Sequence, residues 1–161
     1  MNAVLPSPIA PPTVAAWLAL AVGSWLLLAP VGEGGVQATV IHPGPVVIEA
    51  DRRGQYIAKG HINGIPARLL VDTGAAEVVV PAPLAIRAGL TLGEAQRYRS
   101  VEGVVIGWRT HIPSLRIGAL HLRDVPATVV ETAGDEVLLG MSALRHLGLV
   151  HYQGRMTLSA P

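Results

Sequence analysis

The residues with the clearest chemical potential are Asp72, Thr73, Gly74 and Ala75, which directly follow the apolar run Leu69–Val71. The run is typical of a buried strand, so it predicts a carboxylate at the edge of a core. A carboxylate there is costly unless it is hydrogen-bonded or shares its charge, and it can transfer protons in catalysis. Thr73 can hydrogen-bond the backbone, and Gly74 permits a close approach that a β-carbon forbids. The alternative is an ordinary turn, because Asp, Thr and Gly are common turn residues.

The composition narrows the classes of function. The chain has 161 residues, 50% of them hydrophobic, which suffices for one domain with a real core. Because the formal net charge is +1 and the arginines are scattered, we expect no nucleic-acid partner. The lack of cysteine excludes disulfides, thiol catalysis and cysteine-bound metals. The six histidines show no spacing with acidic residues that indicates zinc, so we expect neither a metal nor a cofactor.

The N-terminal segment differs in kind from the rest of the chain. Met1–Gly32 carries no charged side chain, and its densest apolar run, Thr13–Ala29, lies between prolines. As a helix, this run would be roughly 26 Å long at about 1.5 Å per residue, near the lower limit for crossing a bilayer. The sequence therefore predicts a tail over residues 1–12, a transmembrane anchor over 13–30 and a Gly/Pro-rich linker over 31–45.

A signal peptide is the alternative to the anchor. Val36–Ala38 offers small residues at a plausible cleavage site, but no Lys or Arg precedes the apolar run. The nearest cations after the run are Arg52 and Arg53, too distant to determine the orientation in a membrane by charge counting.

The remaining residues, 46–161, form the predicted domain, and their pattern is mostly β. Asn63-Gly64 between two apolar segments indicates a hairpin with a type I′ turn, and this hairpin ends at Asp72. The predicted strands are Val46–Ile48, Tyr56–Ile62, Ile65–Val71, Glu77–Pro81, Arg97–Glu102, Val104–Ile112, Leu115–Ile117, His121–Val130, Val137–Gly140, Leu149–Tyr152 and Met156–Ser159. A helix is expected over Met141–Leu147, before Gly148, and Leu84–Ala88 is at most a short helix.

Two apolar strands of this domain end at glycine-containing turns about half a domain apart. The first precedes Asp72–Ala75, and the second ends in Leu138, Leu139 and Gly140, just before the predicted helix, with Leu144–Leu149 continuing the pattern. In these features the chain resembles the retropepsin-like (clan AA) aspartic proteases, in particular the membrane-anchored bacterial type with a single Asp-Thr-Gly motif. The resemblance covers Val46 to the C-terminus.

The resemblance implies a fold, a location and an activity. The fold would be all-β, a retropepsin-like acid-protease β-barrel with one short C-terminal helix, preceded by the transmembrane helix. The location would be the inner (cell) membrane, single-pass, with the domain on the periplasmic or extracytoplasmic side. The activity would be that of an aspartic endopeptidase acting on polypeptides. The alternative is a module that keeps the fold for dimerisation or peptide binding without catalysis.

One aspartate cannot act as base and acid at once when water attacks a peptide bond. The other aspartates, Asp51, Asp124 and Asp135, lack a following Thr/Ser-Gly. The resemblance therefore implies a homodimer in which the two Asp72 side chains meet at a two-fold axis and share one proton, because both cannot ionise cheaply. It also implies that Thr73 braces the two loops and that Gly74 offers backbone to the substrate.

Two further expectations concern pH and the substrate cover. Ala75 lacks the hydroxyl that would favour the ionised carboxylate, so we expect an activity optimum at about pH 5–6. By resemblance, a glycine-tipped hairpin closes over the peptide, and Val101, Glu102 and Gly103 are the candidates for its tip. A solvated turn is the alternative for these residues.

Overall fold

A computed structural model describes residues 39–40, 44–100, 103–132 and 134–161 of the chain. The strands are β1 (Thr39–Val40), β2 (Val46–Glu49), β3 (Ile57–Ile62), β4 (Ile65–Val71), β5 (Val78–Pro81), β6 (Ala95–Ser100), β7 (Gly103–Ile117), β8 (Leu120–Val130), β9 (Glu136–Leu139), β10 (Gly148–Tyr152) and β11 (Arg155–Ser159). The helices are α2 (Ala82–Arg87) and α3 (Met141–Leu144).

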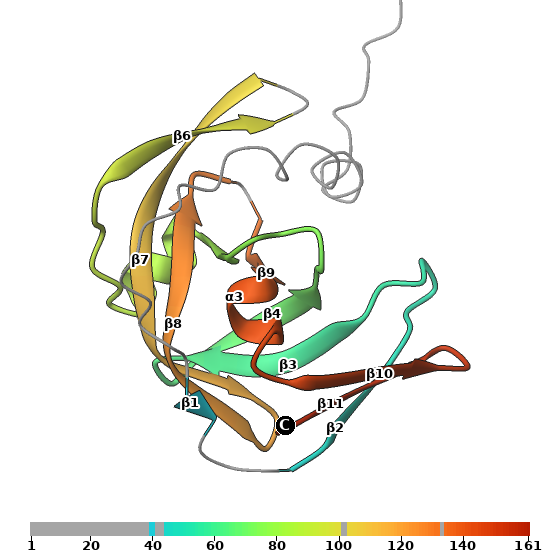
Figure 1. Cartoon of the computed structure of the whole chain (residues 1–161). Coiled ribbons are helices and arrows are strands. Elements are labelled where there is room, and N and C mark those ends of the chain that lie inside the picture. The colour runs from blue at the N-terminus through green and yellow to red at the C-terminus, as the bar shows by residue number, and fades with distance from the viewer. Residues whose placement is uncertain (1–38, 41–43, 101–102, 133) are drawn as a thin grey trace, which may run out of the picture.

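The main sheet closes on itself to form a barrel. Six strands pair in the order β8-β5-β9-β4-β3-β7, and β7 pairs in turn with β8 (Figure 1). Two of these contacts are parallel, β4 with β9 and β5 with β8. The short strand β1, within the range predicted as a linker, adds to β8, and β6 adds to β7. The predicted all-β barrel is therefore the observed architecture.

Alternation along the strands fills the barrel. In β3, for example, Ala58, Gly60 and Ile62 are buried, whereas Lys59 and His61 between them are exposed, as expected for a strand with one face toward the core. The largest fully buried side chains are Ile62, Leu69, Leu84, Ile112, Leu115, Ile117, Leu120, Leu122, Leu139 and Leu158, with Val78 and Val80. Burial of each such side chain favours folding by roughly 1.5–3 kcal/mol relative to an exposed one.

The hairpin that leads to Asp72 has the predicted turn. Asn63 and Gly64 take φ angles of 49° and 84°, as a type I′ turn requires. The Asn63 side chain also accepts a hydrogen bond from the Ser114 N–H (3.1 Å) and donates one to the Ala88 carbonyl (2.9 Å). The turn residue thus anchors β4 to β7 and to the end of α2.

The terminal strands form a second sheet, in the order β10-β11-β2, that extends to one side of the barrel (Figure 1). Ile48, Met156 and Leu158 are buried on one face. On the other face Val47 and Val150 lie opposite the same residue of β11, and they are 60% and 63% exposed. This sheet therefore buries one face and leaves apolar side chains on the other.

The prediction that Pro113 and Ser114 separate two strands is wrong. β7 continues through them as a single strand that pairs with β8 from Gly107 to Ile117. Pro113 and Asp124 are not paired, although the residues on both sides of them are, as Ile112–Val125 and Ser114–Arg123. Asp124 takes a φ of 55°, so a local bend accommodates the proline's missing N–H without ending the strand.

The helical content also differs from the expectation of one short C-terminal helix. A second helix, α2, begins directly after Pro81 with a proline in its first turn, where a missing N–H costs nothing, and it ends before Gly89 at a φ of 64°. The C-terminal helix α3 is shorter than the predicted Met141–Leu147, because its last turns tighten: His146 and Leu147 bond to carbonyls three residues earlier.

The predicted anchor over residues 13–30 lies outside the described residues. Within the part of the chain that the structure describes, no helix is long and apolar enough to cross a bilayer.

Candidate active site

Asp72 directly follows the last residue of β4, a strand that lies between β9 and β3 in the barrel wall. Leu69 and Leu70 are buried before it, and Asp72 itself is half-buried. Its N–H donates to the Leu139 carbonyl of β9 (3.1 Å), and the preceding Val71 N–H donates to the Tyr56 carbonyl (2.9 Å). Strands on both sides therefore fix the point at which the carboxylate leaves the core.

The loop after β4 holds the Asp72 side chain through its own backbone. Asp72 Oδ1 accepts a hydrogen bond from the Gly74 N–H at 2.8 Å, and the Asp72 carbonyl accepts one from Ala75 at 3.3 Å. Such bonds stabilise a half-buried carboxylate and orient it. Thr73 is exposed and Ala75 is buried, so the tetrapeptide turns its hydroxyl outward and its methyl inward.

The second predicted motif lies directly against this loop. Leu138 and Leu139 pair in parallel with Leu70 and Val71, which brings the two apolar strands side by side. The Met141 N–H donates to the Ala75 carbonyl (2.8 Å), and the Ser142 N–H donates to that of Ala76 (3.0 Å). The two motifs, far apart in the sequence, are thus joined by backbone hydrogen bonds.

Gly140 makes this contact possible. A β-carbon at position 140 would overlap the carbonyl of Glu77 and come within 2.8 Å of the Ala75 carbonyl oxygen. Backbone atoms cannot yield as a flexible side chain can, so only glycine lets the loop and the start of α3 approach so closely. This contact is the physical reason for a glycine after Leu139.

The sequence did not indicate the role of Ser142. Ser142 is only 3% exposed. Its hydroxyl accepts a hydrogen bond from the Val78 N–H (2.9 Å) and donates one to the Pro126 carbonyl (2.7 Å). It therefore ties α3 to β5 and β8 beside the loop. The one feature of the sequence that could have indicated this role is a single hydroxyl residue within an otherwise apolar helix turn.

A second group missed at the sequence level surrounds Glu77, the last residue before β5. The Thr128 hydroxyl, fully buried, donates to Glu77 Oε2 at 2.7 Å, and the Tyr98 hydroxyl lies 3.1 Å from the same threonine oxygen. Arg109 Nη2 lies 4.0 Å from Glu77 Oε1. These residues come from β8, β6 and β7, so their proximity depends on strand register and could not be seen in the sequence.

The candidate flap is a hairpin formed by β6 and β7. Val101 and Glu102 lie outside the described residues. Gly103 is the first residue of β7 and pairs with Ser100, the last of β6, so a hairpin stands at the predicted place. Its arms project beyond the barrel (Figure 1).

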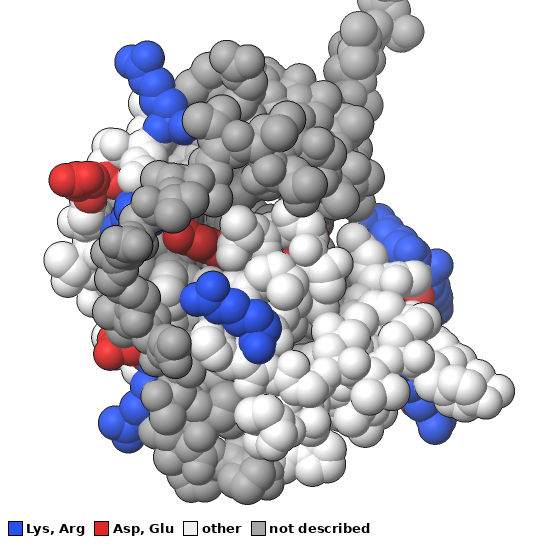
Figure 2. Space-filling model, viewed as in Figure 1, with Lys and Arg blue, Asp and Glu red and all other residues white. Residues whose placement is uncertain are grey.

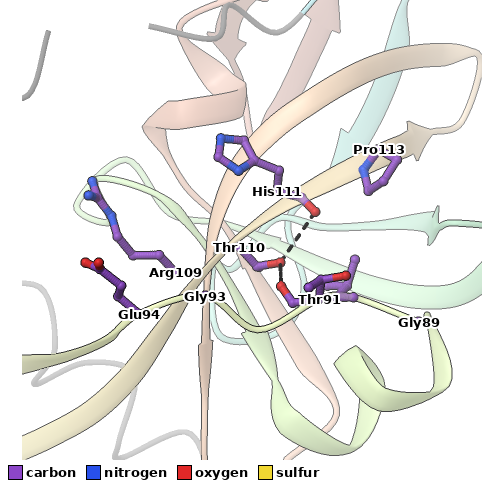
Figure 3. A pocket seen from close by; sticks show the side chains of 9 residues that line it. Gly89, Thr91, Gly93, Glu94, Arg109, Thr110, His111 and Pro113 are labelled. Carbon is purple, nitrogen blue, oxygen red and sulfur yellow. Dashed lines mark hydrogen bonds between the residues drawn. The ribbon is translucent and has the colours of Figure 1, made fainter. Parts of the chain in front are cut away.

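One hollow has no lining residue in the loop of Asp72. It has a volume of about 520 Å³ and opens between the loop before β6 and strand β7 (Figure 3). Its lining consists of Gly89, Leu90, Thr91, Gly93, Glu94, Arg109, Thr110, His111 and Pro113. None of these residues belongs to the loop of Asp72 or to the strand end at Gly140, so the hollow is separate from the candidate site.

On the face seen in Figure 2, the coloured charged side chains are scattered among uncharged surface. Within the described residues, no group of three or more His, Cys, Asp or Glu side chains could hold a metal ion.

Two groups elsewhere have displaced pKa values. Backbone N–H groups of Gln55 and Arg53 donate to the exposed Asp51 carboxylate and lower its pKa. Burial lowers the pKa of His146, and the charge of the neighbouring Arg145 adds to the effect. Arg145 Nε also donates to His146 Nε2 at 3.2 Å. Both shifts arise from local structure outside the candidate site.

Comparison with known families identifies the domain. The family model described as gag-polyprotein putative aspartyl protease matches residues 58–146, more than half of the chain, and the match includes both Asp72 and Gly140. The chain belongs to this aspartyl protease family. A comparison with curated proteins gives no significant match.

The chain is also similar to solved structures. The crystal structure of a retropepsin-like aspartic protease from Rickettsia conorii superposes with a TM-score of 0.63 at 24% identity, covering 71% of this chain and 98% of that chain. The EIAV protease complexed with the inhibitor HBY-793 matches at 20% identity with a TM-score of 0.44, covering 56% of this chain and 86% of that one. The Rickettsia conorii structure confirms a retropepsin-like fold for this aspartyl protease family member.

Proposed function

We propose that the protein is an aspartic endopeptidase that hydrolyses polypeptides between two Asp72 carboxylates, one from each subunit of a homodimer. The observation that carries this proposal is the placement of Asp72: half-buried at a strand end and bonded to the Gly74 N–H in a loop packed against Gly140. Membership of an aspartyl protease family supports the same activity.

The chemistry follows from two carboxylates that share one proton. The ionised Asp72 takes a proton from water, whose oxygen attacks the peptide carbonyl carbon, while the protonated partner's Asp72 donates its proton to the carbonyl oxygen. The resulting tetrahedral diol collapses when Asp72, now protonated, gives its proton to the amide nitrogen, the partner's Asp72 takes a proton from a diol hydroxyl, and the C–N bond breaks. Base and acid are then ready for another cycle, and no metal or covalent intermediate takes part.

The need for a second copy rests on the count of motifs. The chain has one Asp-Thr-Gly sequence, and the other aspartates lack the following Thr/Ser-Gly. Thr73, beside the carboxylate, is exposed in the single subunit. This exposure is required of a residue that would contact the second subunit's loop across a two-fold axis. The terminal sheet supplies further apolar surface, because Val47, Val150 and Tyr152 are 60–69% exposed.

The proposal extends to the cellular setting. Residues 13–30 would anchor the enzyme in the inner membrane as a single span, and residues 31–45 would link the anchor to a periplasmic or extracytoplasmic protease domain. The support is the uncharged apolar composition of the N-terminal segment. Membrane fractionation of the full chain, with and without detergent, tests the anchor: release without detergent would indicate a cleaved leader.

The decisive test of the activity is cleavage of denatured casein by the full chain from pH 4 to 7, with and without pepstatin. Asp72→Asn is the matched control, because the amide oxygen can still accept from Gly74 while the side chain can no longer transfer protons at these pH values. We expect an optimum at about pH 5–6 and no turnover in the variant. A folded, dimeric wild-type protein without activity would instead favour a peptide-binding module.

A further inference from the structure

A chain of polar side chains connects the β6–β7 hairpin to the loop that carries Asp72. Tyr98 on β6 lies 3.1 Å from Thr128 Oγ1 on β8, and Thr128 Oγ1 lies 2.7 Å from Glu77 Oε2. Glu77 in turn follows Asp72 by five positions and precedes β5 directly. Three elements that are distant in the sequence thus meet through two hydrogen bonds.

The direction of these hydrogen bonds follows from proton counting. Thr128 has one hydroxyl proton, and the Glu77 carboxylate can only accept, so Thr128 donates to Glu77. Its oxygen then accepts from the Tyr98 hydroxyl, for which Gln96 Oε1 at 3.4 Å is a longer alternative acceptor. Because Thr128 is fully buried, water is not available to replace either partner if one is removed.

The second arm of the hairpin packs on the same two residues. A β-carbon at Gly107 on β7 would come within 2.7 Å of both the Thr128 methyl group and the Tyr98 ring. Gly107 is buried, so the backbone of β7 lies directly on this pair. Both arms of the hairpin therefore rest on Thr128, one through the Tyr98 hydroxyl and ring and the other through its backbone.

The backbone of Glu77 belongs to the packed contact between the loop that carries Asp72 and Gly140. The residue's carbonyl group is the one that packs against Gly140, and its second carboxylate oxygen lies 4.0 Å from Arg109 Nη2 of β7. The Arg109 side chain is about half exposed, so solvent weakens that ion pair, and the bond to buried Thr128 is the stronger restraint. The backbone from which the Glu77 carboxylate extends is therefore fixed beside the loop that carries Asp72.

We propose that Tyr98, Thr128 and Glu77 are positioning residues that hold the β6–β7 hairpin at a fixed place relative to the Asp72 loop. This inference rests on the proposed protease function, in which the hairpin covers the bound peptide. When the chain of hydrogen bonds is broken, the hairpin spends more time away from the loop. Substrate binding must then restore its position, which raises KM, whereas kcat, measured with the hairpin closed on substrate, changes little.

The test uses two variants that remove single hydroxyl groups and keep shape, Tyr98→Phe and Thr128→Val. Thr110→Val is the matched control, because Thr110 is also a buried threonine of this sheet. Its hydroxyl donates to the Thr91 carbonyl (2.7 Å) and takes no part in the hydrogen bonds that join Tyr98, Thr128 and Glu77. Hydrogen exchange of the full chain without substrate, followed by mass spectrometry, reports on the hairpin amides of residues 95–100 and 103–108 independently of activity.

We expect exchange of these amides to be about threefold to tenfold faster in Tyr98→Phe and Thr128→Val, and unchanged in Thr110→Val. In peptide cleavage, KM should rise by less than the exchange rates do, because KM follows the fraction of molecules whose hairpin is in place, while kcat stays within about twofold. Unchanged exchange in both variants, or equal acceleration in Thr110→Val, would overturn the inference.

A wild-type protein without protease activity would refute the proposed function, and the exchange rates would still decide whether these residues position the hairpin. Tyr98→Phe keeps the ring against Gly107, so it serves if Thr128→Val does not fold.

Discussion

Gly140 and Glu77 approach so closely that a β-carbon on the first would overlap the carbonyl group of the second. The contact joins the end of β9 to the loop that begins at Asp72. The position of the candidate catalytic carboxylate therefore depends on a residue that itself carries no functional group.

Substitution of Gly140 tests this dependence. Gly140→Ala should destabilise the protein by about 1–3 kcal/mol, because backbone atoms of the Asp72 loop must shift to make room. It should also reduce casein cleavage in the protein that remains folded. Denaturant unfolding measures the first effect. Ala76→Ser, an exposed change in the same loop, is the control and should stay within about 0.5 kcal/mol of the wild type. Equal stability of both variants would contradict the proposed contact.

A mixing experiment tests the shared active site. If both Asp72 carboxylates are needed, equal amounts of wild type and Asp72→Asn, allowed to exchange subunits, should show about half the activity of the same wild-type amount alone, because mixed dimers are inactive. In addition, wild-type activity at low concentration should rise with the square of enzyme concentration. Activity unaffected by the mutant chain, under conditions where exchange is verified, would indicate a site complete within one subunit.

Ser142→Ala should reduce stability without altering the chemistry. The change leaves the Val78 N–H and the Pro126 carbonyl without their hydroxyl partner in a buried place, which costs about 1–3 kcal/mol. Chemical unfolding measured by Trp fluorescence gives the free energy, and kcat of the folded fraction should be preserved. A loss below about 0.3 kcal/mol would show that the hydroxyl does not bridge α3 to the barrel as described.

His146 should make stability depend on pH near neutrality. Burial, with the charge of Arg145, lowers its pKa in the folded state below its ordinary value of 6.5. Because the unfolded chain then binds a proton more readily, stability is fully present above pH 6.5 and falls as pH decreases toward the folded-state pKa. A titration of the His146 ring protons by NMR should give a midpoint below 6.5, and Arg145→Gln should raise it. A midpoint at or above 6.5 would contradict the burial argument.

Features determined by local residue chemistry were predictable from the sequence. Asn63-Gly64 specified its turn because both residues tolerate positive φ, and the hairpin it closes ends at Asp72. The family resemblance pointed to Leu138, Leu139 and Gly140 as a second motif, and in the structure β9 pairs in parallel with β4, the strand that leads to Asp72.

Features that depend on contacts between distant strands were not predictable. Pro113 normally indicates a strand end, but here its position opposite Asp124 lets β7 continue. Thr128 occurs in an apolar run, and nothing local distinguishes it from a packing residue. Its partners Glu77 and Tyr98 lie 51 and 30 positions away, so only the register of three strands reveals the hydrogen bonds.

The parallel pairing of Leu70 with Leu138 has a consequence for biosynthesis. Strand β9 and α3 leave the ribosome long after Asp72, and without them the Asp72 loop lacks its backbone partners on Leu139 and Met141. Because such distant pairing forms late in folding, a nascent or C-terminally truncated chain would not yet hold a competent carboxylate. If the domain is the proposed protease, the order of synthesis would keep an unfinished chain inactive until its fold is complete.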